Sequence, residues 1–300
     1  MRPITVRDRE AGVAGLSLTE LPYPHTAEND VIVQVHAAAF TRGELDWPGT
    51  WTDRAGRDRT PSVPGHELSG VVAEVPVGTT GLTVGQRVFG LADWTRNGSL
   101  AEYTAVEARN LAPLPAGVEH VDAAALVISG LTAWQALYDH AQLKTGQTVL
   151  INGVGGAVGS LAVQLAREIG AEIIGTGRAA DEDRAKQLGV HRFVTVEELE
   201  KAGQVDVVLD VIGGEILTRS TALVRPGGTL VTIAEPPTVQ PTGGRALYFV
   251  VEPNRDQLTQ LANRLRDGRV TPLVNNVRPL EETPDAFTAR GRTIIQVVEG

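Results

Sequence analysis

Cysteine is absent from this 300-residue chain. The chain can therefore form no disulfide, use no thiol nucleophile and hold no metal through thiolates. No uninterrupted apolar run is long enough to predict a bilayer span, and no block rich in lysine and arginine offers a surface to polyanions. The formal net charge of −9 also argues against a polyanionic partner. We expect neither a nucleic acid nor a membrane as a partner.

The beginning of the sequence does not have the pattern of a signal peptide. Its first ten residues, MRPITVRDRE, contain no apolar core of the kind that a signal peptide needs. We therefore expect a cytoplasmic protein. Hydrophobic residues make up 42% of the chain and charged residues 21%, which are ordinary globular values, and 300 residues are enough for two domains.

The most specific pattern that is present runs from residue 148 to residue 166, TVLINGVGGAVGSLAVQLA. Its first residues are β-branched and apolar, as in a strand covered on both faces. Apolar residues recur at helical spacing after the glycines, which predicts a helix with one face on the sheet. A glycine turn at this point leaves the helix N-terminus open to a pyrophosphate. The pattern predicts a dinucleotide site, and the alternative is a structural turn of an α/β protein.

The glycines of this turn are Gly153, Gly156 and Gly159, spaced G-x-x-G-x-x-G, with an additional Gly155. The familiar G-x-G-x-x-G pattern would need a glycine at position 158, where the chain has Val158. The physical demands are still met, because the turn is tight, the phosphates can approach closely and the helix can pack on the strand.

The end of the next predicted strand bears on the choice of cofactor. This strand runs through Thr176 into Gly177 and Arg178, with no carboxylate at its tip. A guanidinium binds a 2′-phosphate through two hydrogen bonds, whereas a carboxylate repels it. The sequence therefore favours NADP(H) over NAD(H). The alternative is that Arg178 is a solvated surface residue and that Asp181 or Asp183 reaches back to a ribose.

The pattern of predicted elements changes near residue 123. Before it, short apolar stretches separated by turns predict a β-rich, barrel-like domain. After it, six strands alternate with helices, which predicts a doubly wound parallel sheet. We place the first domain at 1–123, rejoined by 273–300, and the cofactor domain at 124–272. The expected strands lie near 31–37, 69–75, 85–90, 99–106, 148–152, 171–176, 192–194, 205–210, 229–234, 246–251 and 293–298, and the last helix at 256–267.

Several ordered motifs resemble one family. The stretches GQTVLINGVGGAVG, GTGR, DVVLDVIGG and RPGGTLVTIA resemble the medium-chain dehydrogenase/reductase superfamily, in particular its zinc-independent quinone oxidoreductase branch. VPGHELSGVVAEV, GLTVGQRVFG and GSLAEYTAV resemble the GroES-like catalytic domain of that family. The resemblance covers nearly the whole chain. It implies an α/β fold with a GroES-like domain and a Rossmann domain, and a homodimer that transfers hydride from NADPH to a quinone-type acceptor without a metal.

The resemblance also implies residue roles. Positions 156–159 match the pyrophosphate turn, Thr132 and positions 249–251 match residues beside the nicotinamide, and positions 211–213 and 233–235 match loops around the adenosine and nicotinamide. With the residues derived above, the expected cofactor site comprises Thr132, Gly153, Gly156, Ala157, Val158, Gly159, Thr176, Gly177, Arg178, Val211, Ile212, Gly213, Ile233, Ala234, Glu235, Phe249, Val250 and Val251.

The zinc enzymes of the superfamily hold their catalytic metal with two cysteines and a histidine. His66 matches that histidine, but Thr41 stands at the first cysteine position and Ile128 or Ser129 at the second. One imidazole and a threonine make a poor zinc site, so we expect no metal. Thr41 and His66 remain the candidate catalytic residues. His66 is either a hydrogen-bonded histidine with Glu67 as its neighbour or a proton donor to the reduced substrate.

Other residues near these positions have two interpretations. Glu44 is either a residue of the active-site cleft, as its position in the resembling family implies, or a solvated charge on a helix. Trp47, Trp51 and Trp94 either line an apolar substrate pocket or belong to the core. Neither Glu44 nor the three tryptophans distinguish between the possible functions of the chain.

Arginines raise two further possibilities. Arg290 or Arg292 stands in for a C-terminal arginine with which some members of the resembling family hold the phosphate. Arg54, Arg57 and Arg59 are either an entrance for a carrier phosphate or an ordinary surface loop.

Two alternative functions therefore stay open. One is reduction of the C=C bond of an enone, an alkenal or an enoyl thioester. The other is a non-catalytic, NADPH-binding regulatory or structural protein.

Overall fold

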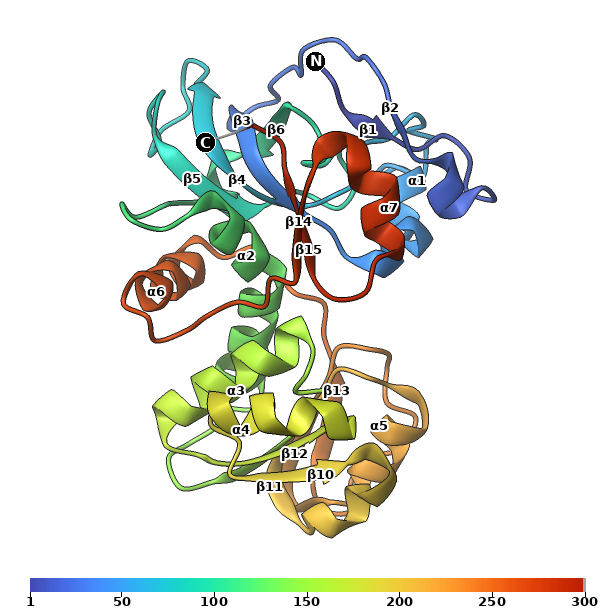
Figure 1. Ribbon diagram of the computed structural model, residues 1–300, viewed down its shortest axis with the longest axis vertical. Helices are drawn as coiled ribbons and strands as arrows, with labels where there is room; N and C mark the ends of the chain where they lie inside the picture. Colours follow the sequence, from blue (N-terminus) through green and yellow to red (C-terminus); the bar gives the residue numbers. More distant parts are fainter. Residues whose placement is uncertain (299–300) are drawn as a thin grey trace. The chain divides into compact units, whose positions relative to one another are not determined.

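The fold is described from a computed structural model, which covers residues 1–298. The chain forms two compact units (Figure 1). The first unit contains residues 1–128, 253–268 and those from 274 on, and the second contains 129–252 and 269–273. Helix α6 (Arg255–Arg266) belongs to the first unit, although the expected cofactor domain included it. The reason is a contact between segments that are distant in the sequence, because the Arg255 guanidinium donates to the carbonyls of Leu111 and Ala108.

The first unit is built on a sheet in the order β14-β15-β3-β4-β5-β7, with β6 paired to β3. Strands β3, β4, β5 and β6 coincide with the four strands expected before residue 123. The C-terminal strand β15 pairs antiparallel with β3, with Ile295 opposite Ala38, so the end of the chain rejoins this unit as expected. The strands are β1 (Ile4–Thr5), β2 (Ser17–Leu18), β3 (Asp30–Ala39), β4 (Glu67–Glu74), β5 (Arg87–Leu91), β6 (Tyr103–Glu107), β7 (Leu111–Pro113), β14 (Asn276–Pro279) and β15 (Thr293–Gln296).

The second unit has one six-stranded sheet in the order β10-β9-β8-β11-β12-β13, and every pair in it is parallel. This confirms the doubly wound sheet. The chain leaves β8 toward β9 and β10 and later returns to β11 on the opposite side of β8. The switch point of the topology therefore lies between β8 and β11. The strands are β8 (Thr148–Asn152), β9 (Glu172–Gly177), β10 (Arg192–Thr195), β11 (Val205–Asp210), β12 (Val224–Thr232) and β13 (Arg245–Tyr248).

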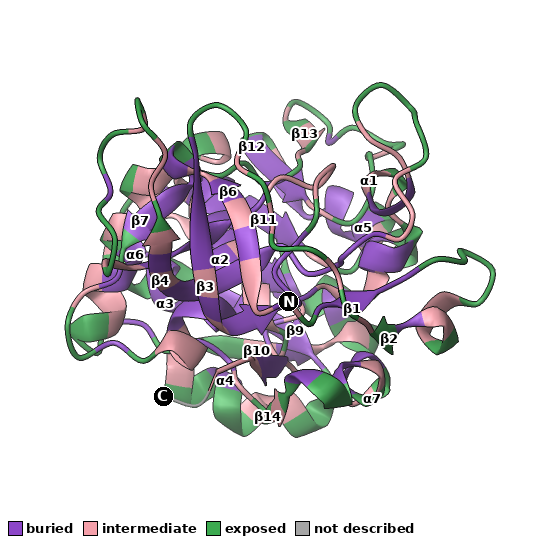
Figure 2. Ribbon diagram, turned by 90° about the horizontal axis from the view of Figure 1, so that it is seen from above, coloured by how far each residue is buried: buried purple, intermediate pink, exposed green. Residues whose placement is uncertain are grey.

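Helices pack on these sheets through their apolar faces. Leu161, Ala162, Leu165 and Ala166 of α3 are buried, and Gly170 ends the helix in the left-handed region at φ +79°. Figure 2 shows buried residues gathered in the strands and exposed residues in the loops and on the outer helix faces. The remaining helices are α1 (Pro48–Trp51), α2 (His120–Trp134), α3 (Ala157–Ile169), α4 (Glu182–Leu188), α5 (Gly214–Thr221) and α7 (Thr283–Thr288), with short helical turns η1 (Gly12–Gly15), η2 (Arg42–Asp46), η3 (Ala108–Asn110), η4 (Gln135–His140), η5 (Ala179–Asp181), η6 (Val196–Ala202) and η7 (Leu280–Glu282).

Helix α2 and the π-helical turn η4 form one continuous segment, His120–His140. By length and composition alone this segment is long and apolar enough to cross a membrane, which the sequence analysis did not anticipate. However, 72% of its most apolar window is buried inside the protein. Residues such as Leu126 and Leu131 are completely enclosed. We interpret the segment as a core helix.

Candidate functional site

The glycine turn follows β8 and depends on residues without side chains. Gly153 lies in the left-handed region at φ +77°, and its N–H donates to the Thr176 carbonyl at 3.0 Å. A Cβ on Gly153 would lie 2.9 Å from Val211 Cγ2. A Cβ on Gly159 would collide with the Gly153 carbonyl oxygen and lie 2.9 Å from Val154 Cα. The turn and the first turn of α3 are therefore packed too closely for larger residues.

The N-terminus of α3 is open. Its N-cap is Gly156, which has no side chain, and within residues 1–298 no side chain caps this helix. The N–H groups of Ala157, Val158 and Gly159 form its first turn, where an α-helix leaves its amides without intrahelical partners. These amides and the positive end of the helix dipole suit an anion. The turn thus fits the pyrophosphate of a dinucleotide.

The other expected cofactor residues follow the carboxyl ends of the parallel strands. Residues 176–178 end or follow β9, 211–213 follow β11, 233–235 follow β12 and 249–251 follow β13. Parallel strands place these ends at one edge of the sheet, beside the glycine turn. Thr132 is different, because it is buried within α2. The fold brings together the expected loops and the first turn of α3, whereas Thr132 comes from the interior of α2.

The side chains of Thr176 and Glu235, both in this set, form hydrogen bonds within the protein. Thr176 is fully buried, and its hydroxyl donates to Asn152 Oδ1 at 3.0 Å. Its backbone carbonyl accepts the Gly153 N–H and so holds the glycine turn. Glu235 Oε1 accepts the Gly214 N–H at 2.6 Å. The start of α5 is therefore covered by a carboxylate.

A buried polar network behind the turn was missed by the sequence analysis. Asp210 Oδ2 accepts the Thr232 hydroxyl and the Gly213 N–H, both at 3.0 Å, and Asp210 Oδ1 accepts Asn152 Nδ2 at 3.2 Å. These contacts join the carboxyl ends of β8, β11 and β12 and fix the loops that follow them. The available signal was a polar residue closing each apolar strand, in VLIN and VVLD.

Arg178 is held by a carboxylate. Its side chain is 83% exposed, and its Nε and Nη2 donate to Asp181 Oδ2 and Oδ1 at 3.2 and 3.3 Å. The hydrogen bond and the charge of Asp181 raise the pKa of Arg178. Asp181 also lies against the glycine turn, since a Cβ on Gly155 would be 2.6 Å from its Cγ. The structure is therefore compatible with Arg178 as a ligand of the 2′-phosphate, since an exposed guanidinium follows β9. It is also compatible with Asp181 as a ligand of the ribose, since this carboxylate reaches back to the turn.

In the first unit, Glu44 has a structural role. Its Oε2 accepts the Thr41 N–H at 3.1 Å and its Oε1 accepts the Gly65 N–H at 2.5 Å. The side chain is completely buried. The interpretation of Glu44 as a solvated charge is wrong, because the carboxylate satisfies two backbone donors and fixes the segments carrying Thr41 and His66.

His66 is buried without a hydrogen bond. It is 1% exposed, and within residues 1–298 neither ring nitrogen has a hydrogen-bond partner. The nearest charged atom given for it is Glu44 Oε2, 3.9 Å from Nδ1. The interpretation of His66 as a hydrogen-bonded histidine is therefore wrong, and its two nitrogens are buried polar atoms without a hydrogen-bond partner in the described part of the chain.

Two indoles lie beside this imidazole. The centroids of the Trp94 and Trp47 rings are 5.3 and 6.3 Å from that of His66, and the two indoles meet edge to face at 5.0 Å. Trp51 belongs to the core, where its Nε1 donates to the Leu45 carbonyl at 2.7 Å. Of the three tryptophans, Trp47 and Trp94 are thus the two that surround the candidate catalytic residue.

Glu67, the sequence neighbour of His66, pairs with Arg292 instead. The Arg292 guanidinium binds the Glu67 carboxylate and donates to the Phe40 carbonyl at 2.7 Å, and Glu67 Oε2 accepts the Ile128 N–H at 2.9 Å. Burial raises the pKa of Glu67, and Arg292 opposes that shift. Because these contacts engage Arg292 within the first unit, it is not available as a substitute phosphate ligand.

The donor set around His66 does not fit zinc. Tetrahedral zinc sites use cysteine, histidine and carboxylate ligands, and the family positions here hold only His66 and Thr41. No group of three histidine, cysteine, aspartate or glutamate residues within 1–298 is arranged to hold a metal ion. We therefore derive no chemical step through a metal.

Two family descriptions match the sequence. "Alcohol dehydrogenase GroES-like domain" matches residues 27–116, and "Zinc-binding dehydrogenase" matches residues 157–250. The 2-methylene-furan-3-one reductase of Solanum lycopersicum is 31% identical over 92% of this chain and 74% of its own length. The chloroplastic NADPH-dependent alkenal/one oxidoreductase of Arabidopsis thaliana is also 31% identical, over 92% of this chain and 73% of its own.

The fold has counterparts among solved structures. The quinone oxidoreductase from Coxiella burnetii superposes with a TM-score of 0.89, covering 99% of both chains at 24% identity. At this identity the likeness shows the shared fold.

Proposed function

Because the chain belongs to the medium-chain dehydrogenase/reductase superfamily, we propose that it uses NADPH to reduce a conjugated carbonyl compound without a metal. The observation that carries this proposal is the glycine turn at the switch point of the sheet, which leaves the N-terminus of α3 open beside an exposed arginine. Oxidoreductase chemistry is the family's activity. The cofactor and the acceptor are the parts that we propose.

The residues present fit the cofactor in two places. The first-turn amides of α3 would hold the pyrophosphate, and the Arg178 guanidinium would bind the 2′-phosphate. The loops after β11 and β12 would enclose the adenosine. When bound, NADPH supplies the hydride.

His66 is the proposed proton donor. Reduction of a conjugated carbonyl adds a hydride to one carbon and a proton to the oxygen or the α-carbon. A protonated imidazole gives one N–H proton to the substrate and becomes neutral, and here it breaks no hydrogen bond within the described protein when it donates. Trp47 and Trp94 keep water from this imidazole, which strengthens its interaction with the developing negative charge. Solvent returns the proton to the ring after the product has left.

The acceptor has two candidates of related chemistry. Quinones and enones both carry a C=C bond conjugated to a carbonyl. The names of the two 31% identical relatives, which refer to a furanone and to alkenals or enones, favour an enone. The motifs of the chain favour a quinone. We place the enone first.

A panel of acceptors tests this proposal. Purified protein is mixed with NADPH and, in turn, with cyclohexenone, an alkenal, benzoquinone and a crotonyl thioester, and NADPH absorbance is followed. We expect oxidation with the enone or alkenal, and oxidation with benzoquinone alone would reverse the order of the two candidates. If NADPH binds but none of the acceptors supports its oxidation, the chain is a non-catalytic binding protein.

Cofactor choice has its own test. The substitution Arg178→Ala should weaken NADPH binding about 10- to 100-fold, since hydrogen bonds to a phosphate are lost, and leave NADH binding within about twofold. The control is Arg109→Ala, which removes another exposed arginine, 80% exposed and paired to a nearby glutamate. Equal losses for NADPH and NADH would contradict the assignment of the 2′-phosphate.

We also propose a homodimer. Strand β13 is an edge strand of the second unit's sheet, and it can pair with a second copy once the Gln240 side chain releases the N–H and the carbonyl of Ala246. Sedimentation should give twice the chain mass of 31.8 kDa. A single-chain mass at micromolar concentration would contradict this proposal.

A further inference from the structure

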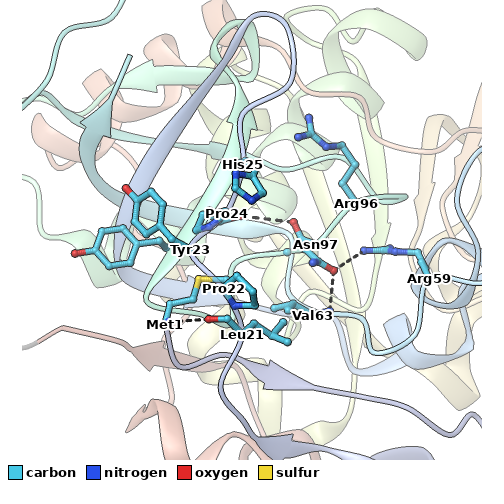
Figure 3. Close-up of a pocket in the computed structure, with 14 residues that line it drawn as sticks. Met1, Leu21, Pro22, Tyr23, Pro24, His25, Arg59, Val63, Arg96 and Asn97 are labelled. Carbon is cyan, nitrogen blue, oxygen red and sulfur yellow. Dashed lines mark hydrogen bonds between the residues drawn. The ribbon is translucent and has the colours of Figure 1, made fainter. Parts of the chain in front are cut away.

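A hollow lies in the first unit. It has a volume of about 450 Å³, which is within the range of small-molecule sites. Its walls come from residues 21–25, from residues 96–98 and 103–105, and from the segment that carries Arg59 and Val63. In Figure 3, Tyr23 and Arg59 lie on opposite sides of the hollow, with Asn97 between them. No step of the proposed reaction uses it.

The lining of this hollow is basic in an acidic protein. The chain has a formal net charge of −9, yet the residues around the hollow include two arginines, Arg59 and Arg96, and one histidine, His25, with no aspartate or glutamate. One of the arginines is already neutralised, because Arg96 Nη1 and Nη2 donate to the buried Asp30 at 2.9 and 2.5 Å. Two positive groups at the hollow have no carboxylate bonded to them within residues 1–298: the guanidinium of Arg59 and the ammonium of Met1, which donates to the Leu21 carbonyl at 2.8 Å.

Arg59 is half-buried, and among the described residues no carboxylate is bonded to it directly, although the charges of Asp93 and Asp53 lie near enough to act on it. Its guanidinium donates to the Gly49 carbonyl, to the Trp94 carbonyl at 3.5 Å and to Asn97 Oδ1 at 3.1 Å, all of which are neutral acceptors. No carboxylate lies within 4.0 Å of it in the described part of the chain, whereas its neighbours Arg54 and Arg57 are paired with Asp93 and Asp53. Burial lowers the pKa of Arg59, but a guanidinium stays charged at neutral pH. A partly desolvated cation of this kind is stabilised by a bound anion.

The opposite wall is aromatic and apolar. The rings of Tyr23 and Tyr103 meet with their centroids 5.0 Å apart, and Leu21, Val63 and Ala105 add aliphatic surface. A flat apolar group packs well on such a wall. The combination selects a small molecule with an anionic end and an aromatic body.

We propose that this hollow binds a small aromatic carboxylate, with the carboxylate on Arg59 and the ring against Tyr23 and Tyr103. Arg59 also connects the hollow to the candidate catalytic residues, because the Trp94 carbonyl that it holds belongs to the residue packed on His66. The site does not depend on the proposed reaction. A ligand there acts on the first unit whichever acceptor the protein reduces.

The test compares two probes on the intact protein. Biphenyl carboxylate and its neutral amide, biphenyl carboxamide, are titrated by calorimetry at micromolar to millimolar concentrations. We expect saturable one-to-one binding of the carboxylate and at least about tenfold weaker binding of the amide, because a charge-assisted hydrogen bond is lost. No binding of the carboxylate at millimolar concentration, or equal affinity for both probes, would overturn the proposal.

Variants then locate the site. Arg59→Gln should weaken the binding of biphenyl carboxylate by about tenfold or more. Arg54→Gln, which removes an exposed arginine outside the hollow, should leave the affinity of the protein for biphenyl carboxylate unchanged. Tyr23→Ala changes an exposed ring and tests the aromatic wall even if the loss of Arg59 impairs folding. Binding that survives both Arg59→Gln and Tyr23→Ala, in proteins with wild-type thermal unfolding, would place the ligand elsewhere and contradict the proposal.

Discussion

The carboxylate of Asp181 binds the guanidinium of Arg178 through two contacts, Oδ2 to Nε at 3.2 Å and Oδ1 to Nη2 at 3.3 Å. The same carboxylate lies against Gly155 of the glycine turn. A 2′-phosphate on Arg178 must therefore compete with Asp181 for the guanidinium and be placed close to its negative charge. Asp181 is thus an internal competitor of the phosphate that Arg178 is proposed to bind.

Replacing Asp181 should release that competition. We expect Asp181→Asn to tighten NADPH binding about three- to tenfold, a modest gain because exposed ion pairs contribute little, and to leave NADH binding unchanged. The asparagine oxygen can still accept the Arg178 N–H, so the local turn is retained. Fluorescence titration with both cofactors measures the effect. Weaker binding of NADH with unchanged binding of NADPH would instead identify Asp181 as the ligand of the ribose hydroxyls.

The glycine turn predicts a second effect. Gly159→Ala places a methyl group against the Gly153 carbonyl and Val154 Cα. We expect a loss of about 1–3 kcal/mol in the free energy of unfolding and a large loss of NADPH affinity, because the turn must move. Urea unfolding and fluorescence titration measure the two quantities.

Gly43→Ala is the matched control for that substitution. A Cβ on Gly43 meets no atom within 4 Å, and its φ lies outside the left-handed region. Its free energy of unfolding should stay within about 0.5 kcal/mol of the wild type. Similar losses for Gly43→Ala and Gly159→Ala would show that packing at the turn is not the cause.

His66→Phe separates a chemical role from a structural one. Because neither ring nitrogen is hydrogen-bonded in the protein, removing them should leave the melting temperature unchanged or raise it. Loss of a proton donor should lower kcat by about 100-fold or more while the dissociation constant for NADPH is retained. Steady-state kinetics and thermal unfolding of the same preparation give both values. A lower melting temperature with unchanged kcat would make His66 a structural residue.

The first unit should lose stability in acid through His120. Its Nδ1 lies 2.7 Å from the Ser69 hydroxyl, and its Nε2 accepts Arg87 Nε at 3.3 Å. Burial, followed by the charges of His36 and Arg87, lowers the pKa of His120 from 6.5 to about 4. The unfolded state therefore binds the proton more readily. The stabilisation is complete above about pH 6.5 and is lost as the pH falls toward 4.

Urea unfolding between these pH values measures this loss. We expect it to reach about 2 kcal/mol, less than the full linkage value because the ring is partly exposed. His120→Gln should reduce the slope, and an unchanged slope would assign the acid sensitivity to other groups.

The sequence was sufficient for features that depend on local order. The turn at Gly153 and the strand that ends at Gly177 were predictable, because a buried strand, glycines and an amphipathic helix follow one another directly. The return of the strand at 293–298 to the first domain was also expected from its apolar sequence, but its partner β3 was not.

Contacts between distant segments were not predictable in this way. Glu44 reads as a helix charge, and only the position of Gly65 shows why it is buried. The assignment of α6 to the first unit depends on Arg255 reaching the carbonyls of Ala108 and Leu111. The missing hydrogen bonds of His66 are likewise a property of its surroundings rather than of the PGHE motif.

The most direct test of the proposed function follows the hydride itself. The protein is incubated with cyclohexenone and NADPH that carries deuterium at the transferable position of the nicotinamide, and the product is analysed by mass spectrometry and NMR. The account predicts cyclohexanone with deuterium on the β-carbon, formed in equal amount to the NADPH oxidised and unaffected by a metal chelator. A product without deuterium, or activity that disappears with the chelator and returns with zinc, would contradict it.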